Sequence, residues 1–196
     1  MPEFRYRFSL TKKIQKNDGK GKHFCDTLCY NATVGHFKKT STGKPAQWLI
    51  EAAADIGLNF TGLTHEITNE LTAHSIKRHG DRNIHGMATI TGTDFDRISD
   101  IVKTPDYAII GAIRKGTLIN AYAKITNGIT YLYFEEVLIS RKNKALRGKT
   151  LYKVTKQLSF DEVLKNVSRN GKTDISKARI LNTQKNVQTA GGHPGG

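Results

Sequence analysis

The sequence contains few cysteines, few prolines and no long apolar run. Its 196 residues include 2 Cys and 4 Pro, and no stretch approaches the roughly 20 apolar residues that a membrane-spanning helix needs. Two cysteines can form at most one disulfide, which cannot hold a fold of this size together, so its stability must come from a packed core. Hydrophobic residues make up 37% of the chain, enough to form such a core. This composition excludes a wholly disordered polyelectrolyte.

The two cysteines, Cys25 and Cys29, lie in HFCDTLCYNATVGH. With His23 and His36 they make four metal-binding side chains, but their spacing matches no standard zinc motif. We therefore expect reduced thiols, and the sequence predicts no metal or other cofactor. The first residues carry charges inside their only apolar run, unlike a secretory signal peptide. These observations predict action in the cytoplasm without membrane association.

Positive charge is in excess, and it is concentrated at the two ends. Lys and Arg number 31 against 17 Asp and Glu, a formal charge of +14. Residues 1–22 carry +5, residues 141–196 carry +10, and the segments between them sum to −1. Lys and Arg bind nucleic acids by releasing counterions from phosphates. The basic ends therefore predict a nucleic-acid partner, with a purely solubilising role as the alternative.

The same pattern divides the chain into three parts. We expect a basic N-terminal extension over 1–44, a core domain over 45–156 and a basic C-terminal tail over 157–196. From about Lys165 onward the sequence is poor in large apolar residues. Such a segment cannot bury enough surface to offset chain entropy, so most of it is expected to be flexible or loosely docked.

Three helices are predicted in the first half of the chain. The first is the Ala-rich stretch 45–56, the second runs from Thr64 as its N-cap to Gly80, and the third follows Thr93 and ends before Pro105. Together with the strands that follow, they predict an α+β fold.

After these helices the apolar period changes to two, which is typical of strands. The sequence predicts a four-stranded antiparallel meander with strands at 107–114, 117–126, 129–139 and 150–155. The basic segment SRKNKALRGK (140–149) separates the last two strands and is expected to be a loop or short turn. Helices therefore precede the sheet in the predicted fold.

The dipeptide Asn127-Gly128 is a strong hairpin signal, and it determines the register of the second and third strands. Thr126 then opposes Ile129, and counting outward pairs Lys124 with Tyr131, Tyr122 with Tyr133 and Asn120 with Glu135. One face is apolar and is expected to face the core; the other presents Asn120, Tyr122, Lys124, Tyr131, Tyr133 and Glu135. This polar face is either a solvated surface or a recognition surface whose tyrosines stack on bases and whose Lys124 meets phosphate. Glu136 points into the apolar set, where a basic partner or a β-bulge would accommodate it.

Four of the seven histidines lie between residues 65 and 85. On the second predicted helix, His74 continues the apolar face, so it points inward or across a cleft. His79 lies near the helix C-terminus beside Lys77 and Arg78, where the macrodipole favours a protonated imidazole. Both histidines are either hydrogen-bonded core residues or general acid–base groups.

An ordered set of motifs resembles a known family. LTAHSIKRHGD, then ITGTDFDRISDIVKTPDYAI, a Lys-bearing strand, a Tyr-rich strand and a basic loop before KTLYKVTK are similar to the phage-type nucleases of the barnase, EndoU, colicin and RelE superfamily. The resemblance spans residues 63–156. It implies a metal-independent ribonuclease, acting as a toxin of phage or mobile-element origin. The implied partners are RNA, with tRNA as one candidate, an immunity protein or antitoxin, and a phage or larger precursor protein; virion association or delivery is an alternative to purely cytoplasmic residence.

The resemblance also implies site residues. It assigns catalysis to His74, His79, Lys124, Thr150 and Tyr152: the histidines as acid and base, Lys124 stabilising phosphate charge, and the two hydroxyls bonding the phosphate. The products would carry a 2′,3′-cyclic phosphate. Barnase itself uses a glutamate as base, but Glu135 shows no clear match to it. Substrate contacts are expected from Lys77, Arg78, Tyr122, Tyr131, Tyr133, Arg141, Lys142, Lys144, Arg147 and Lys149.

Two other functions compete with this hypothesis. A non-catalytic RNA- or DNA-binding or virion-associated protein could use the same scaffold. A metal-dependent DNA nuclease is disfavoured, because the polar sheet face lacks the clustered carboxylates that bind Mg²⁺.

Overall fold

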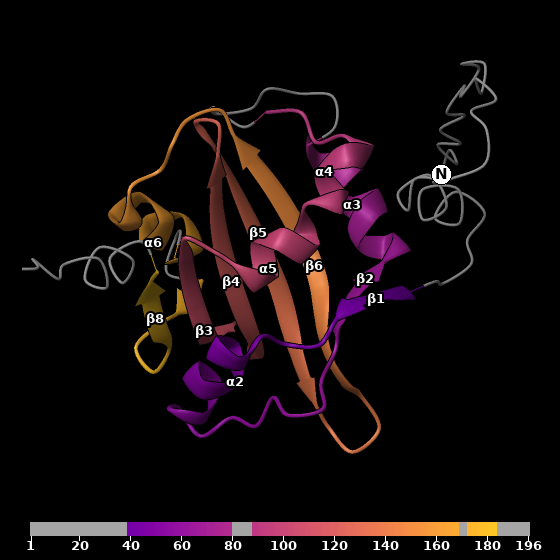
Figure 1. The fold of residues 1–196 in the computed structure, drawn as a ribbon, viewed down its shortest axis with the longest axis vertical. Coiled ribbons are helices and arrows are strands. Elements are labelled where there is room, and N and C mark those ends of the chain that lie inside the picture. The colour runs from indigo at the N-terminus through magenta and orange to yellow at the C-terminus, as the bar shows by residue number, and fades with distance from the viewer. Residues whose placement is uncertain (1–38, 80–87, 169–171, 184–196) are drawn as a thin grey trace, which may run out of the picture.

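The computed structural model describes residues 39–79, 88–168 and 172–183, which form helices on a twisted sheet (Figure 1). The described sheet has eight strands in the order β1-β2-β6-β5-β4-β3-β7, with β8 also on β3. All strand pairs are antiparallel except β2 with β6. The strands are β1 Lys39–Gly43, β2 His65–Thr68, β3 Tyr107–Arg114, β4 Thr117–Thr126, β5 Ile129–Ile139, β6 Lys144–Val154, β7 Thr173–Asp174 and β8 Arg179–Asn182. The helices are α2 Gln47–Ala54, α3 Asn69–His79, α4 Gly92–Asp96, α5 Ile98–Lys103 and α6 Phe160–Ser168.

The predicted α+β class is confirmed, but two parts of the predicted architecture are wrong. The four-stranded meander is only the centre of a larger sheet, because β1 and β2 extend it beyond β6, and β7 and β8 extend it beyond β3. The helices do not all precede the sheet, since β1 lies before α2 and α6 follows β6. The proposed boundaries of the three parts of the chain stay a prediction.

The central hairpin of β4 and β5 forms in the predicted register. Thr126 pairs with Ile129, Tyr122 with Tyr133 and Asn120 with Glu135. Asn127 and Gly128 have φ values of 52° and 74°, as a type I′ turn requires at both central positions. The turn chemistry therefore determines the pairing of β4 with β5.

The second predicted helix is wrong over its first residues. His65–Thr68 forms β2 instead, which fills the space between β1 and β6. The helix α3 begins after it, and the Thr68 hydroxyl accepts a hydrogen bond from the Leu71 backbone N–H at 3.2 Å. Tertiary strand pairing thus overrides the helical period here, and the capping residue is Thr68 rather than Thr64.

The third predicted helix is divided into α4 and α5. Its N-cap is Thr91 rather than Thr93, and the Asp94 carboxylate accepts a 2.8 Å hydrogen bond from the Thr91 backbone N–H. The same carboxylate accepts from Tyr131 Oη at 3.0 Å and from Lys153 Nζ at 3.1 Å. Asp94 therefore joins the start of α4 to the sheet.

Two separate cores cover the two faces of the sheet. On the face seen in Figure 1, α2, α3 and α5 pack on the sheet with Leu49, Leu71 and Ile101 fully buried. On the opposite face, Val163 and Val167 of α6 pack against a second apolar cluster that includes Phe134. Burial of apolar surface on both sides is what holds this sheet between layers.

The C-terminal segment expected to be largely flexible contains regular secondary structure in its described residues, 165–168 and 172–183. It forms the end of α6 and the strands β7 and β8, and β8 pairs with β3 from Tyr107 to Ile110. Within the described ranges, no helix is long and apolar enough to cross a membrane. Backbone pairing with β3 therefore compensates for the low apolar content of this segment.

Candidate functional site

The face of the sheet under α2, α3 and α5 is the one that the sequence presents as polar, and it is buried. Tyr122, Tyr131 and Tyr133 are each at most 3% exposed. The prediction that they stack on bases is therefore wrong, because a substrate cannot reach their rings. The error arises because helices cover this face, where Tyr122 bonds to Glu135 and Tyr131 bonds to Asp94 instead of facing solvent.

Those polar atoms form a buried hydrogen-bond network. Glu135 is 0% exposed, and its carboxylate accepts from Tyr122 Oη at 2.9 Å and lies 2.7 Å from His65 Nδ1. Asn120 donates to Tyr122 Oη at 3.2 Å and accepts from the Gly111 N–H at 3.1 Å. Burial, together with the charge and hydrogen bond of Glu135, raises the pKa of Tyr122 well above its usual value. Glu135 is thus part of the interior, and nothing places it near a substrate.

Lys124 lies on this same face and not beside the histidines. Its ammonium group donates to the Thr104 backbone carbonyl at 2.6 Å and to the Thr104 hydroxyl at 3.2 Å, at the end of α5. Tyr152 pairs with Leu132, which in turn pairs with Ala123, so these three side chains share one face of the sheet. Lys124 is the next residue after Ala123, and its side chain therefore points to the other face. The structure therefore does not bring Lys124 together with the predicted histidines, because its side chain bonds to the end of α5 on the other face.

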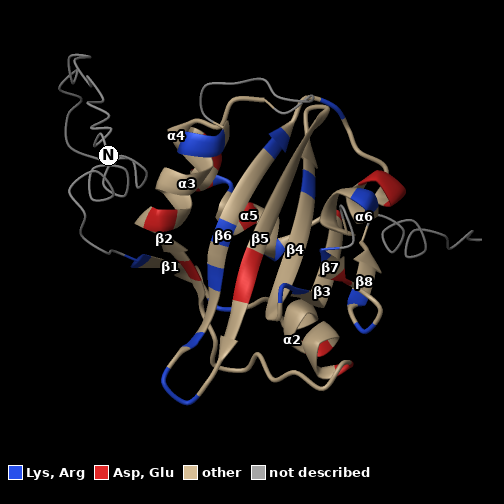
Figure 2. Ribbon diagram, turned by 180° about the vertical axis from the view of Figure 1, so that it is seen from behind, with Lys and Arg blue, Asp and Glu red and all other residues tan. Residues whose placement is uncertain are grey.

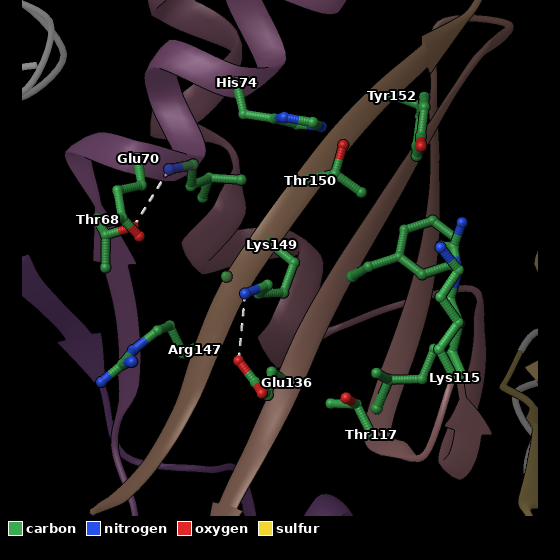
Figure 3. A pocket seen from close by; sticks show the side chains of 15 residues that line it. Thr68, Glu70, His74, Lys115, Thr117, Glu136, Arg147, Lys149, Thr150 and Tyr152 are labelled. Carbon is green, nitrogen blue, oxygen red and sulfur yellow. Dashed lines mark hydrogen bonds and ion pairs between the residues drawn. The ribbon is translucent and has the colours of Figure 1, made fainter.

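The opposite face of the sheet holds a pocket of about 520 Å³ (Figure 3). We call it the α3–β6 pocket. It is lined by Thr68, Glu70, Leu71, His74, Arg114, Lys115, Thr117, Ile119, Phe134, Glu136, Arg147, Gly148, Lys149, Thr150 and Tyr152. In Figure 3, His74 extends from α3 toward β6, where Thr150 and Tyr152 lie. Seen from this side, Lys and Arg recur along β6 (Figure 2).

A β-bulge in β6 brings its functional side chains to one face. Arg147 pairs with Glu136, but Thr150 pairs with Phe134, so Lys149 is an extra residue. In a regular strand, positions three apart point to opposite faces, yet here Arg147 and Thr150 both line the pocket. Bulges often occur next to active sites, where they redirect a side chain. The basic segment expected to be a loop is therefore a strand from Lys144 onward.

A second irregularity, in β3, brings Arg114 to the same face. Ile109 pairs with Ala121 but Ala112 pairs with Ile119, so β3 gains one residue beside Gly111. Gly111 has a φ of 78°, which glycine adopts readily. Arg114 lies beyond this point and lines the α3–β6 pocket. Among the described residues it forms no ion pair with an acid.

Polar groups in the pocket differ in whether they are already bonded. Lys149 Nζ lies 3.2 Å from Glu136 Oε2 (Figure 3), and Arg147 lies 3.7 Å from Glu66. In contrast, the buried Thr150 hydroxyl has no hydrogen-bond partner within the described part of the chain. An unpaired buried hydroxyl is costly unless a ligand bonds to it. Thr150 and the unpaired Arg114 are therefore available to an anion.

Helix α3 positions both predicted histidines over β6. The Ser75 hydroxyl accepts a hydrogen bond from the Leu151 backbone N–H at 3.2 Å, which fixes the helix to the strand edge. The adjacent His74 lines the pocket and is exposed. The ring centroid of His79 lies 4.5 Å from that of Tyr152. Four of the five predicted catalytic residues thus gather here, and Lys124 is the exception.

Both imidazoles favour the neutral form. Burial lowers the pKa of His74, and Arg78, Lys149 and Lys77 lower it further. Burial also lowers the pKa of His79, with His74 and Arg78 adding to the effect. The protonated imidazole expected at the helix C-terminus is therefore not favoured for His79, because partial burial and neighbouring cations outweigh the macrodipole. The two rings can accept protons near neutral pH.

The remaining predicted substrate contacts fall into two groups. Arg147 and Lys149 line the pocket, as do Arg114, Lys115 and Glu70, which sequence reasoning missed. The other group does not line it: Lys77 and Arg78 are exposed at the end of α3, and Arg141, Lys142 and Lys144 lie at the β5–β6 turn, which Figure 2 shows in blue.

Metal binding has no candidate site in the described ranges, where no three His, Cys, Asp or Glu side chains cluster. The alternative metal site at His23, Cys25, Cys29 and His36 lies outside the described residues.

Comparison with known families identifies the class of protein that carries this site. The sequence model of the phage-Barnase-EndoU-ColicinE5/D-RelE like nuclease3 family matches residues 43–161. The match covers more than half of the chain and includes β2 through the start of α6. The chain therefore belongs to this nuclease family, as its motifs predicted. No curated protein and no solved structure matches it.

Proposed function

We propose that this nuclease is a metal-independent endoribonuclease whose active site is the α3–β6 pocket. The observation that carries the proposal is geometric: His74 and the unpaired Thr150 hydroxyl line one cationic pocket, and the His79 ring lies 4.5 Å from the ring of Tyr152, which also lines it. Cleavage of RNA by its own 2′-OH needs a base, an acid and stabilisation of a dianionic phosphorane, and these groups can supply all three.

His74 and His79 divide the two proton transfers. A neutral imidazole removes the 2′-OH proton as the 2′-oxygen attacks the phosphorus, and a protonated imidazole donates to the departing 5′-oxygen. Their lowered pKa values favour the base before substrate binds. An arriving phosphate adds negative charge, which raises the pKa of a nearby imidazole and favours the acid. The products are a 2′,3′-cyclic phosphate and a 5′-hydroxyl.

Arg114 and Thr150 take the role that the sequence assigned to Lys124. The Arg114 guanidinium presents fixed donors that suit phosphate oxygens. The Thr150 hydroxyl can donate to a developing oxyanion without first losing another partner. Lys115 and Lys149 add positive charge at the rim of the pocket.

The test of this proposal is RNA cleavage in excess EDTA. Purified protein is incubated with total RNA and with tRNA. If the new 3′ ends carry a cyclic phosphate, they should resist phosphatase until acid opens the ring. His74→Ala and His79→Ala should each lower turnover by about 10²–10⁴-fold, whereas Lys103→Ala, on the opposite side of the sheet, should not.

Three outcomes separate the competing hypotheses. Absence of cleavage in EDTA with cleavage after added Mg²⁺ would indicate metal-dependent chemistry. Salt-sensitive RNA binding without product would favour the non-catalytic binding protein. Full activity in both histidine variants, with unchanged thermal unfolding, would place the active site elsewhere.

We further propose a toxin role, of phage or mobile-element origin, with action in the bacterial cytoplasm. The family supports a nuclease, and a nuclease that cuts cellular RNA, for instance tRNA, would need an immunity protein or antitoxin in its own host. Induction in a bacterium should then arrest growth, and His74→Ala should relieve the arrest. Growth arrest that persists with His74→Ala would contradict this role.

A further inference from the structure

A second pocket of about 350 Å³ adjoins the α3–β6 pocket on the same face of the sheet. We call it the α6 pocket. It is lined by Arg114, Leu132, Phe134, Tyr152, Val154, Lys156, Leu158, Glu162, Lys165, Asn166 and Val167. Arg114, Phe134 and Tyr152 line both pockets. The two pockets therefore meet across one cation and two aromatic rings.

The outer wall of the α6 pocket comes from a helix that lies almost wholly beyond the nuclease match. The family match ends at residue 161, whereas Glu162, Lys165, Asn166 and Val167 all follow it. Val163 and Val167 anchor the helix on the sheet with 2% and 3% exposure, respectively. Their burial turns Lys165 and Asn166 into a fixed wall of the pocket. The α6 pocket is thus formed partly by residues inside the family match and partly by residues that follow it.

The chemistry of the α6 pocket matches a nucleotide. Its floor is apolar and aromatic. The acidic residue in its lining, Glu162, is paired with Lys156 at 2.5 Å, and therefore does not neutralise Arg114 or Lys165. Lys165 is exposed and has no acidic partner among the residues described. Aromatic floors hold bases by stacking, and unpaired Lys and Arg hold phosphates. Both volumes fall in the range of about 300–1,000 Å³ typical of small-ligand pockets.

We propose that the α6 pocket binds the nucleotide next to the scissile phosphate, so that the substrate is single-stranded RNA extended from one pocket to the other. Arg114 contacts the scissile phosphate, which joins the nucleotide in the α6 pocket to the nucleotide in the α3–β6 pocket. Lys165 contacts the next phosphate along the chain. A base must be unstacked to reach the partly exposed ring of Tyr152, which a continuous duplex does not allow. This inference rests on the proposed ribonuclease activity.

The experiment varies substrate length and one cation together. The substrates are mixed-base DNA oligonucleotides with one ribonucleotide: a minimal dinucleotide, and versions extended by three deoxynucleotides on the 5′ side or the 3′ side. The proteins are wild type, Lys165→Glu, Asn166→Ala and the control Lys103→Glu, which makes the same charge change on α5 at the opposite face.

One extension should raise kcat/KM of the wild type by about tenfold or more, and Lys165→Glu should abolish most of that gain through KM with little change in kcat. For the favoured substrate, Lys165→Glu should also reduce the slope of log(kcat/KM) against log[salt] by about 0.7, the value for one single-strand phosphate contact. Asn166→Ala should act in the same direction more weakly. Lys103→Glu should leave the length dependence unchanged.

Each contrary result identifies which proposal fails. If the wild type cleaves all substrates equally, or if Lys165→Glu and Lys103→Glu behave alike, the α6 pocket does not bind substrate although the ribonuclease proposal stands. If folded RNA is cleaved but no extended chimera is, the single-stranded substrate is wrong. If no RNA is cleaved under any condition, the proposed function itself fails.

Discussion

The two faces of the sheet carry polar side chains of the same kinds but use them differently. Under α2, α3 and α5, the carboxylate of Glu135 is matched by His65 and Tyr122 and is fully buried. On the other face, Arg114 and the Thr150 hydroxyl have no such partners within the described ranges. Buried polar groups that satisfy one another specify a fold. Polar groups left unmatched beside a pocket are available to a ligand.

Adjacent glutamates show the difference within one strand. Glu135 points into the helix-covered core, whereas Glu136 lines the α3–β6 pocket and pairs with Lys149. Because successive strand residues point to opposite faces, substitutions at neighbouring positions should have separable effects. Substitutions under the helices should lower stability, and those in the pocket should alter activity.

The largest expected effect on stability is that of Glu135→Ala. The substitution leaves His65 and Tyr122 without their buried acceptor, and loss of one member of a buried pair costs about 3–5 kcal/mol. The matched control Glu136→Ala removes a partly exposed ion pair and should cost less than about 1 kcal/mol. Urea unfolding measures both. Equal losses for the two variants would remove the distinction between the faces.

Gly148→Ala should affect stability and activity together, because Gly148 lies in the β6 bulge, where it contacts the helix-covered core and also lines the α3–β6 pocket. An added Cβ would lie 2.4 Å from Tyr133 Oη and 2.7 Å from Leu71 Cδ2. Overpacking of this kind costs about 1–3 kcal/mol, and the shift of β6 would displace Thr150.

A second substitution tests that cause. Adding Tyr133→Phe removes the closer of the two contacts and should recover part of the lost unfolding free energy, a coupling that independent sites do not show. Additive losses in the double variant would indicate that the clash lies elsewhere.

Asp94→Asn should lower stability by about 1–2 kcal/mol at neutral pH. Burial alone would raise the pKa of Asp94, but hydrogen bonds from the Thr91 backbone, Lys153, the Thr91 side chain and Tyr131 lower it below its usual value of 3.8. A lowered carboxyl pKa contributes stability above the unfolded pKa and loses it as the pH falls through the folded pKa. The difference between wild type and variant should therefore shrink below about pH 4, as measured by thermal unfolding across pH. A constant difference would contradict the charged network.

The smallest expected effect is a shift in pH dependence on replacing Lys149 with Gln. Lys149 helps to lower the pKa of His74, so its removal raises that pKa. If His74 is the base, the acidic limb of the kcat/KM profile moves to higher pH, because protonation inactivates it sooner.

Lys77→Gln provides the comparison for that shift. Lys77 also lowers the pKa of His74 but does not line the pocket, so the limb should move in the same direction without a rise in KM. If neither variant moves the acidic limb, His74 is not the group that titrates there.

The sequence was sufficient to predict the class of fold and the register of its central hairpin. Both follow from local signals: period-two alternation in the strands and the Asn127-Gly128 turn. The histidine helix was also predicted, although its first turn proved to be β2. That difference depends on β1 and β6, which pair with β2 from distant parts of the chain.

Which face would carry the site could not be predicted by alternation. Counting in twos from Tyr107 places Arg114 on the wrong side, because the irregularity beside Gly111 reverses the alternation. The same count separates Arg147 from Thr150, since it does not include the bulge at Lys149. Alternation alone therefore predicts that the face with Tyr122 and Glu135 is accessible to a substrate. Which face is accessible depends on where the helices pack, and the register of the hairpin carries no information about helix packing.

The bulge at Lys149 makes the proposed active site dependent on chain length as well as on residue type. Deletion of this one residue would restore a regular strand. Either Thr150 and Tyr152 or Arg147 would then turn toward the face that α2, α3 and α5 cover. Every side chain proposed for chemistry would still be present, yet they would no longer share a pocket. When related sequences are compared, a one-residue gap at this position should therefore count more heavily against shared activity than a conservative substitution within the pocket.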